Sequence, residues 1–207
     1  MPTVATTKPD LTKQEAILHQ SVHVFARQGF RGTDVQEIAD RAGVGKGTVY
    51  RYFGDKQALF WATAYWVLEQ LHSRLKDATD PADGALNKLS ASCRTYAKFF
   101  AENPDYLEVF VLDRAEFRGR APEHHQELHE QMIREFTEII EQGMASGEVR
   151  RDDPRKIVWT LGSTLYGSVV FAAFSKQEQS ITELAAHATE IFLRGIATAS
   201  DQEGTAT

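Results

Sequence analysis

The segment from Gly45 to Phe53 carries an unusual set of side chains for a helix. Its only two anchors for a hydrophobic core are Val49 and Phe53, which lie four residues apart. The remaining residues are small, hydroxylated or basic, and they could contact a nucleic acid: Gly45, Lys46, Gly47, Thr48, Tyr50, Arg51 and Tyr52. A helix that buries so little is suited to a DNA groove, where such side chains reach base edges and backbone oxygens.

The residues on both sides of this segment predict the helices that would position it. Thr33 with Gln36 three residues later forms a capping-box pattern, so we expect a helix to begin there. Gly43 stands where the chain must turn and where a left-handed residue costs least. Asp55 is placed to cap the following helix, whose first amides together with Lys56 would form a phosphate site. This is a helix-turn-helix pattern, and we count Thr33 and Lys56 among its predicted DNA contacts.

The order and spacing of these residues resemble the TetR/AcrR family of bacterial one-component transcriptional repressors. The resemblance covers about the first quarter of the chain and is carried by Ile17, Phe25, Ala26, Gly29, Phe30, Thr33, Ile38, Ala39, Ala42, Gly43, Val44, the run 47–53, Lys56 and Leu59. It implies a regulator that binds double-stranded DNA and has an effector pocket in a larger body. One position departs from the family pattern, because Gly45 stands where the family often has serine and offers no hydroxyl to a phosphate.

Composition limits the class of protein. The 207 residues carry a net charge of −6, but residues 1–60 contain eight Lys/Arg against six Asp/Glu, so the first part is weakly basic and the remainder acidic. This asymmetry fits a small DNA-binding head on an acidic body. A single cysteine, Cys93, rules out an intramolecular disulfide and suits the cytosol, and the first residues show no signal peptide. We therefore expect a cytoplasmic protein.

Helical periodicity continues along the rest of the chain, and no useful length alternates with a period of two. We predict an all-α protein of about nine helices: a disordered arm over 1–10, a helix-turn-helix head over 11–58, a helical effector-binding and dimerisation body over 59–199 and a disordered tail over 200–207. One helix runs from Asp55 to about Leu75 and so belongs to both parts. It is either a mechanical link between them or a plain scaffold, and the family resemblance favours the link.

The stretch from Ile157 to Phe174 has eighteen residues without a charge. That length is near the lower limit for a membrane span, but two glycines and four Ser/Thr dilute it, so we expect no membrane insertion. A helix that is apolar all round is otherwise buried on all sides, which a second chain would provide. We predict a homodimer whose interface includes Gly162, Leu165, Val169, Ile191 and Phe192.

Aromatic residues are frequent in the body, and ordinary core packing explains most of them. Together they could line a pocket for an apolar or aromatic effector, with a charged group as anchor. The predicted effector-binding residues are Trp66, Tyr96, Phe100, Tyr106, Phe110, Arg114, Phe117, Trp159 and Tyr166. Arg114 would suit a carboxylate on the ligand.

Other chemistry finds less support. His125 and His129 lie four residues apart and would share a helix face, but no cysteine or fixed fourth ligand accompanies them, so we expect a solvated helix end and no metal. The sequence has no glycine-rich phosphate loop or nucleophile elbow, so we predict neither an enzyme nor a cofactor. The alternative to an effector-responsive repressor is a DNA-binding or architectural protein that a protein partner controls.

Overall fold

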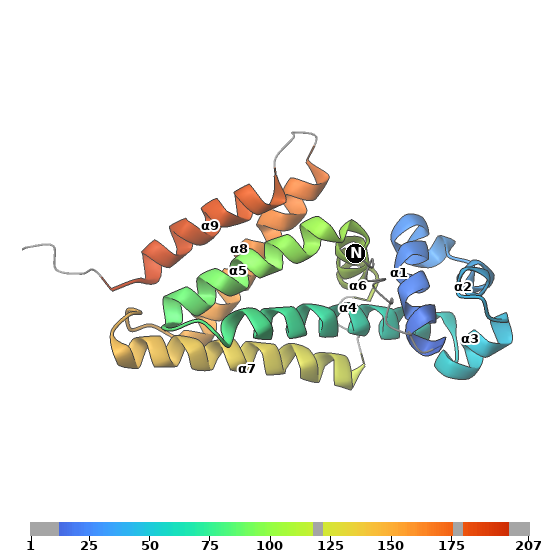
Figure 1. The fold of residues 1–207 in the computed structure, drawn as a ribbon, viewed down its shortest axis with the longest axis horizontal. Coiled ribbons are helices and arrows are strands. Elements are labelled where there is room, and N and C mark those ends of the chain that lie inside the picture. The colour runs from blue at the N-terminus through green and yellow to red at the C-terminus, as the bar shows by residue number, and fades with distance from the viewer. Residues whose placement is uncertain (1–12, 118–121, 176–179, 199–207) are drawn as a thin grey trace, which may run out of the picture. The chain divides into compact units, whose positions relative to one another are not determined.

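The computed structural model describes residues 13–117, 122–175 and 180–198, and within these ranges the chain is all-α, as predicted (Figure 1). The helices are α1 Lys13–Gly32, α2 Val35–Arg41, α3 Lys46–Phe53, α4 Lys56–Thr79, α5 Ala85–Glu102, α6 Pro104–Phe117, α7 Glu123–Ser146, α8 Pro154–Phe174 and α9 Ile181–Ile196. The predicted arm over 1–10 and tail over 200–207 lie outside the described residues.

The described residues divide into two units. The first contains residues 13–67 and 108–117, and the second contains residues 68–107 together with those from 122 onward. Helix α4 passes from the first unit into the second between Val67 and Leu68 without interruption. The part of α6 that begins at Glu108 groups with the first unit, so both units contain segments from different parts of the sequence.

Three phenylalanine rings form the centre of the first unit. Phe25 and Phe60 meet edge to face with 5.0 Å between ring centroids, and Phe30 lies 5.5 Å from Phe60. Phe30 reaches this position because Gly29 adopts φ 68° and ends the regular part of α1, a conformation that glycine tolerates best. These contacts join α1 to the start of α4, with the half-buried Phe30 at the edge of the group.

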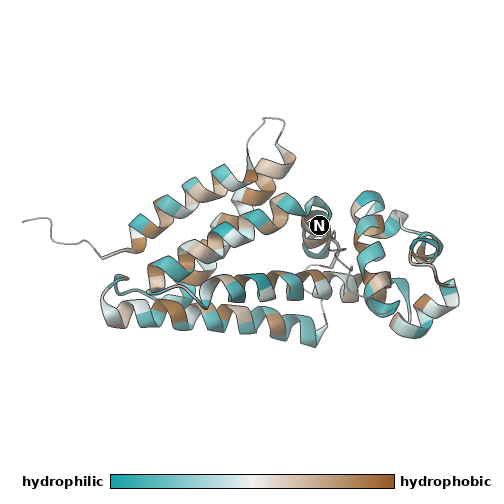
Figure 2. Cartoon of the chain, in the orientation of Figure 1, coloured by the Kyte–Doolittle hydropathy of each residue, from teal (hydrophilic) through white to brown (hydrophobic). Residues whose placement is uncertain are grey.

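The second unit is a bundle in which α9 packs against α5 and α8, and α7 packs against α5 and α8 (Figure 1). Its helices show hydrophobic and hydrophilic residues along different faces, as amphipathic helices do (Figure 2). Gly147 adopts a left-handed conformation and ends α7. An isolated antiparallel bridge between Val149 and Ala197 joins the residues that follow α7 and α9, the one pairing of strand type in the described ranges.

Helix α8 is long and apolar enough to cross a membrane by length and composition alone, which is weak evidence for a span. About 28% of its most apolar window is buried inside the chain. The buried residues recur at helical spacing and form one stripe: Ile157, Leu161, Leu165, Val169 and Ala172. The opposite side of α8 is therefore open, and it is not enclosed by the rest of the chain.

Gly143 in α7 provides a test of this packing. Alanine is the better helix former by about 1 kcal/mol, but a Cβ at this position would lie 2.5 Å from Ala85 Cβ and 2.7 Å from Val149 Cγ2. We expect Gly143→Ala to lower the free energy of unfolding by about 1–3 kcal/mol, because the side chains of Ala85 and Val149 leave no room for the extra methyl. The measurement is denaturant unfolding followed by circular dichroism. Gly47→Ala is the control, since nothing lies within 4 Å of its Cβ position, and equal stability changes in both variants would contradict the packing.

Candidate nucleic-acid interface

Helix α3 has the exposure expected of a DNA-reading helix. Val49 is fully buried and Phe53 is half-buried, so these two residues anchor the helix as predicted. Tyr50 and Tyr52 are 39% and 43% exposed, and Arg51 is exposed as well. The hydrogen-bonding groups of α3 therefore face solvent, where a duplex can reach them.

The turn before α3 follows the prediction closely. Gly43 adopts φ 68°, and the amide of Val44 donates to the carbonyl of Ala39 at 3.0 Å, which closes the turn after α2. Gly45 is the N-cap of α3 in an extended conformation and contributes no side-chain cap. Nothing lies within 4 Å of its Cβ position, so the site has room for a larger side chain.

Thr33 was predicted to contact DNA and to cap a helix, and the structure corrects both predictions. Its side chain is buried, and its hydroxyl donates to the carbonyl of Gly29 at 2.7 Å. Asp34, not Thr33, caps α2, because the carboxylate Oδ1 accepts the amide hydrogen of Gln36 at 2.9 Å. The hydroxyl of Thr33 is therefore engaged inside the unit and does not point toward a ligand outside it. The general preference for aspartate at N-caps is the signal that could have identified Asp34.

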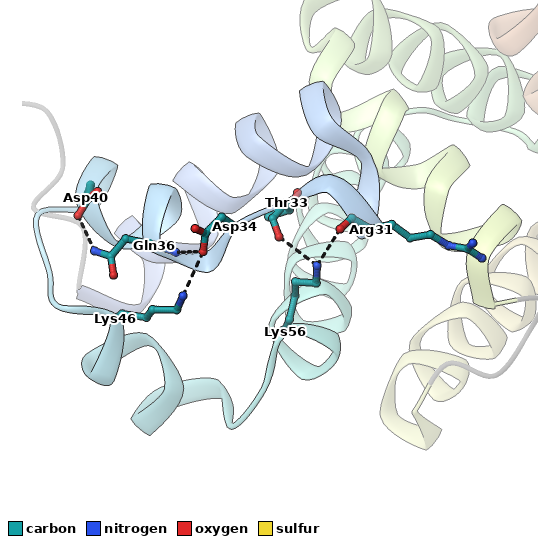
Figure 3. A network of polar contacts seen from close by, with 7 residues as sticks. All are labelled: Arg31, Thr33, Asp34, Gln36, Asp40, Lys46 and Lys56. Carbon is teal, nitrogen blue, oxygen red and sulfur yellow. Dashed lines mark hydrogen bonds and ion pairs between the residues drawn. The ribbon is translucent and has the colours of Figure 1, made fainter.

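Asp34 also contacts the predicted DNA-reading helix. Its Oδ1 accepts a hydrogen bond from Lys46 Nζ at 3.1 Å, and Figure 3 shows the two side chains reaching toward each other from α3 and the start of α2. The Gln36 amide and then Lys46 lower the pKa of Asp34 from its ordinary value, and the hydrogen bond to Asp34 raises the pKa of Lys46. Both shifts favour the charged forms, as expected of two groups that bond each other.

Groups that were predicted to bind phosphate at the start of α4 already form hydrogen bonds within the chain. Asp55 caps α4 as expected, with its Oδ1 accepting the amide hydrogen of Ala58 at 2.7 Å. Lys56 Nζ donates to the carbonyls of Arg31 and Thr33 at 3.1 and 3.0 Å (Figure 3). An ammonium group has three donors, so at most one remains for a phosphate. Lys56 thus ties the start of α4 to the end of α1, a role that its sequence position did not reveal.

The predicted effector residues are only partly brought together. Tyr96, Phe100 and Tyr106 belong to one group of rings completed by Phe99, with neighbouring centroids 5.0–5.5 Å apart. Burial raises the pKa of the Tyr106 phenol. This group lies where α5 meets the beginning of α6, in the second unit.

The other predicted effector residues belong to the first unit, to α8 or to the end of α6. Arg114 stands 5.2 Å from the ring of Phe110, and both belong to the first unit with Trp66. Tyr166 is half-buried on α8, while Trp159 is exposed on the outside of α8, so its ring does not line an interior pocket of this chain. The side chain of Phe117 lies outside the described residues.

A cleft of about 230 Å³ does occur in the second unit, but its walls are more polar than predicted. It is lined by His72, Leu75, Lys76, Thr79, Asp80, Lys88, Glu135, Phe136, Glu138, Ile139 and Gln142. His72 Nε2 and Glu135 Oε2 form a pair at 2.7 Å within it. Burial acts to raise the pKa of Glu135, but the hydrogen bonds from His72 and Gln131 outweigh it and the pKa is lowered. None of the predicted effector residues lines this cleft.

The predicted dimer residues separate into two sets. Gly162 and Ile191 are exposed, and Phe192 is half-buried, so these residues remain available to a second chain. Leu165 and Val169 are buried within the chain and cannot form the surface of an interface, which corrects the prediction. The large apolar residues that α8 and α9 do expose are Trp159, Phe171, Phe174 and Ile191.

Histidine and cysteine residues show no convergent arrangement in the part of the chain that the structure describes, where no three metal-ligating side chains come together. His125 is buried and His124 is exposed, although they are neighbours. Cys93 is buried in α5, and burial raises the pKa of its thiol to about 11. A thiol with that pKa is protonated at neutral pH, so it lacks the thiolate that nucleophilic catalysis requires.

Comparisons with known proteins agree with this geometry. The family model described as bacterial regulatory proteins, tetR family, matches residues 17–63, and the tetracyclin repressor-like C-terminal domain matches residues 82–196. The HTH-type transcriptional repressor KstR2 of Mycobacterium tuberculosis is 25% identical over 144 residues, which is 68% of this chain and 71% of KstR2. YerO of Bacillus subtilis, an uncharacterized HTH-type transcriptional regulator, is 27% identical over 103 residues, which is 49% of this chain but only 36% of YerO.

Solved structures show the same fold. FadR from Bacillus subtilis, a transcriptional regulator determined in complex with stearoyl-CoA, superimposes with a TM-score of 0.76 at 23% identity. The match covers 87% of this chain and 98% of FadR. At that identity the likeness concerns the fold, and it extends through both units.

Proposed function

Because this chain belongs to the TetR family of bacterial DNA-binding transcriptional regulators, we propose that it is a repressor that binds a palindromic operator as a homodimer. A small apolar or aromatic effector in the body would release it. The observation that carries the proposal is the exposed polar surface of α3, which is held by the buried Val49 and the half-buried Phe53. A protein with this role acts on chromosomal DNA, which places it in the cytoplasm.

The short reading helix makes dimerisation necessary for useful specificity. Helix α3 has eight residues and can contact few base pairs by itself. Two copies related by a two-fold axis read a palindrome, with half-site centres about 34–36 Å apart or a multiple of that distance. Arg51 and Lys56 would displace counterions from phosphates, so affinity should fall steeply as salt rises.

The exposed face of α8 and α9 supports the homodimer. Trp159 and Phe171 are 57% and 61% exposed on α8, and Ile191 is 61% exposed on α9. Gly162 lies on the same helix as the two aromatic residues and has nothing within 4 Å of its Cβ position, which would allow another helix to approach closely. Large apolar side chains exposed on two helices that pack against each other favour a surface that a partner covers.

The first test separates phosphate contacts from base contacts. Tyr50→Ala and Lys56→Ala should weaken binding to all duplexes, whereas Lys46→Ala or Thr48→Ala should change sequence preference, by about 1–3 kcal/mol at the affected base pair. The operator is first obtained by selecting bound fragments from random DNA, and affinities are then measured by fluorescence anisotropy. An equal loss on every duplex for all four variants would contradict this division. Lys56→Ala also needs an unfolding measurement, since Lys56 bonds two backbone carbonyls.

The second test concerns the dimer. Phe171→Glu places a charge in the exposed apolar face, and we expect it to convert a dimer into a monomer because an unpaired charge resists burial. Sedimentation equilibrium measures the change. Lys98→Glu, at an exposed position of α5, is the control and should leave the mass unchanged. A wild-type protein that is monomeric at all concentrations would remove the basis for palindrome recognition.

The effector proposal rests on the ring group of α5 and α6 and on the complex of FadR with stearoyl-CoA. We expect at least one compound from a panel of acyl-CoA thioesters, steroids and aromatic acids to release the selected DNA. Tyr106→Leu should raise the concentration needed for half release severalfold without changing DNA affinity in the absence of ligand. If no compound releases DNA and a protein partner does, the alternative of an effector-independent DNA-binding protein holds.

A further inference from the structure

Asp34 is the one acidic side chain that the structure bonds to the predicted reading helix within the described residues. Its carboxylate joins two elements, since Oδ1 accepts from the Gln36 amide in α2 and from Lys46 Nζ in α3 (Figure 3). Both contacts lie at the protein surface, where the side chains of Lys46 and Asp34 are 38% and 68% exposed. The negative charge therefore stands on the surface that would meet a polyanion.

We propose that Asp34 is a specificity-determining residue whose carboxylate holds Lys46 away from phosphate and so lowers the affinity for DNA of arbitrary sequence. The inference rests on the proposed function and concerns the same site. Lys46 is the first residue of α3, so its ammonium group stands at the leading end of the helix that enters the groove. A lysine at that position without a partner would bind any phosphate within reach.

The physical basis is competition between two anions for one cation. Non-specific DNA binding comes almost entirely from lysine and arginine contacts with phosphate, and each such contact adds about 0.9 to the salt dependence of log K. While Asp34 neutralises Lys46, that contact with phosphate is lost. A base edge that offers a well-placed acceptor still receives a hydrogen bond from Lys46, because an ammonium group has three donors. The pair of Asp34 and Lys46 therefore lowers the affinity for DNA of arbitrary sequence more than it lowers the affinity for the operator.

Asp34→Ser tests the proposal without loss of the helix cap, because serine and aspartate are comparably good N-cap residues. The variant should bind a duplex of scrambled sequence about eightfold more tightly at about 0.1 M salt, with no gain near 1 M, as one added phosphate contact requires. The ratio of operator affinity to scrambled-duplex affinity should fall. Thermal unfolding verifies that the head remains intact, and Asp34→Asn serves as a second variant if the serine protein is unstable.

Asp40→Ser is the matched control. Asp40 lies in α2, the helix that Asp34 caps, and its carboxylate accepts a hydrogen bond from Gln36 Nε2. Replacing Asp40 therefore changes the net charge by the same amount as replacing Asp34, but it leaves the bond between Asp34 and Lys46 in place. If Asp40→Ser raises the affinity as much as Asp34→Ser does, the effect is a general change in charge and the proposal is wrong.

A double variant isolates the ion pair. In a Lys46→Met background, Asp34→Ser should no longer change the salt dependence, because the cation that it releases is absent. A gain that survives in this background would overturn the proposal, since the carboxylate would then act on the DNA directly. Failure of the proposed function looks different: the wild-type protein would select no sequence from random DNA, whatever the behaviour of the Asp34 variants.

Discussion

The contact between Phe25, Phe30 and Phe60 is the interaction on which the DNA-binding unit depends. These rings fasten the end of α1 to the beginning of α4, and burying one such side chain stabilises a protein by about 1.5–3 kcal/mol. The same junction is closed from outside by Lys56, which donates to carbonyls at the end of α1. Because both ends of the helix-turn-helix are fixed in this way, α3 needs little burial of its own.

Because α1 and α4 stabilise the unit, the polar groups of α3 can remain exposed to solvent. A helix that had to stabilise the unit would bury an apolar face, whereas α3 buries only Val49 completely. Its tyrosines and basic residues are left for a ligand, and one of them, Lys46, pairs with the Asp34 carboxylate. The ion pair adds little stability at such exposure. Its proposed effect is that Lys46 bonds the Asp34 carboxylate in preference to a DNA phosphate.

The second unit uses the same residue types for a different purpose. Helix α8 buries one stripe against the rest of the bundle and leaves Trp159 and Phe171 outside, so a single chain covers only part of its apolar surface. By length and composition alone a membrane could also cover that face, but the chain belongs to a family of DNA-binding transcriptional regulators. The cleft in this unit has several charged residues in its lining, and none of the ring group of α5 and α6 lines it.

The sequence by itself determined the elements and the class of protein. Local signals are sufficient for this, because helical periodicity, the glycine at position 43 and the polar run of α3 each act over a few residues. The tertiary structure decided which side chains remain available. The Thr33 side chain is buried, Lys56 donates to two backbone carbonyls, and Leu165 and Val169 are buried within their own chain. Contacts such as Lys56 with Arg31 join residues 25 positions apart, and no local pattern encodes a partner at that distance.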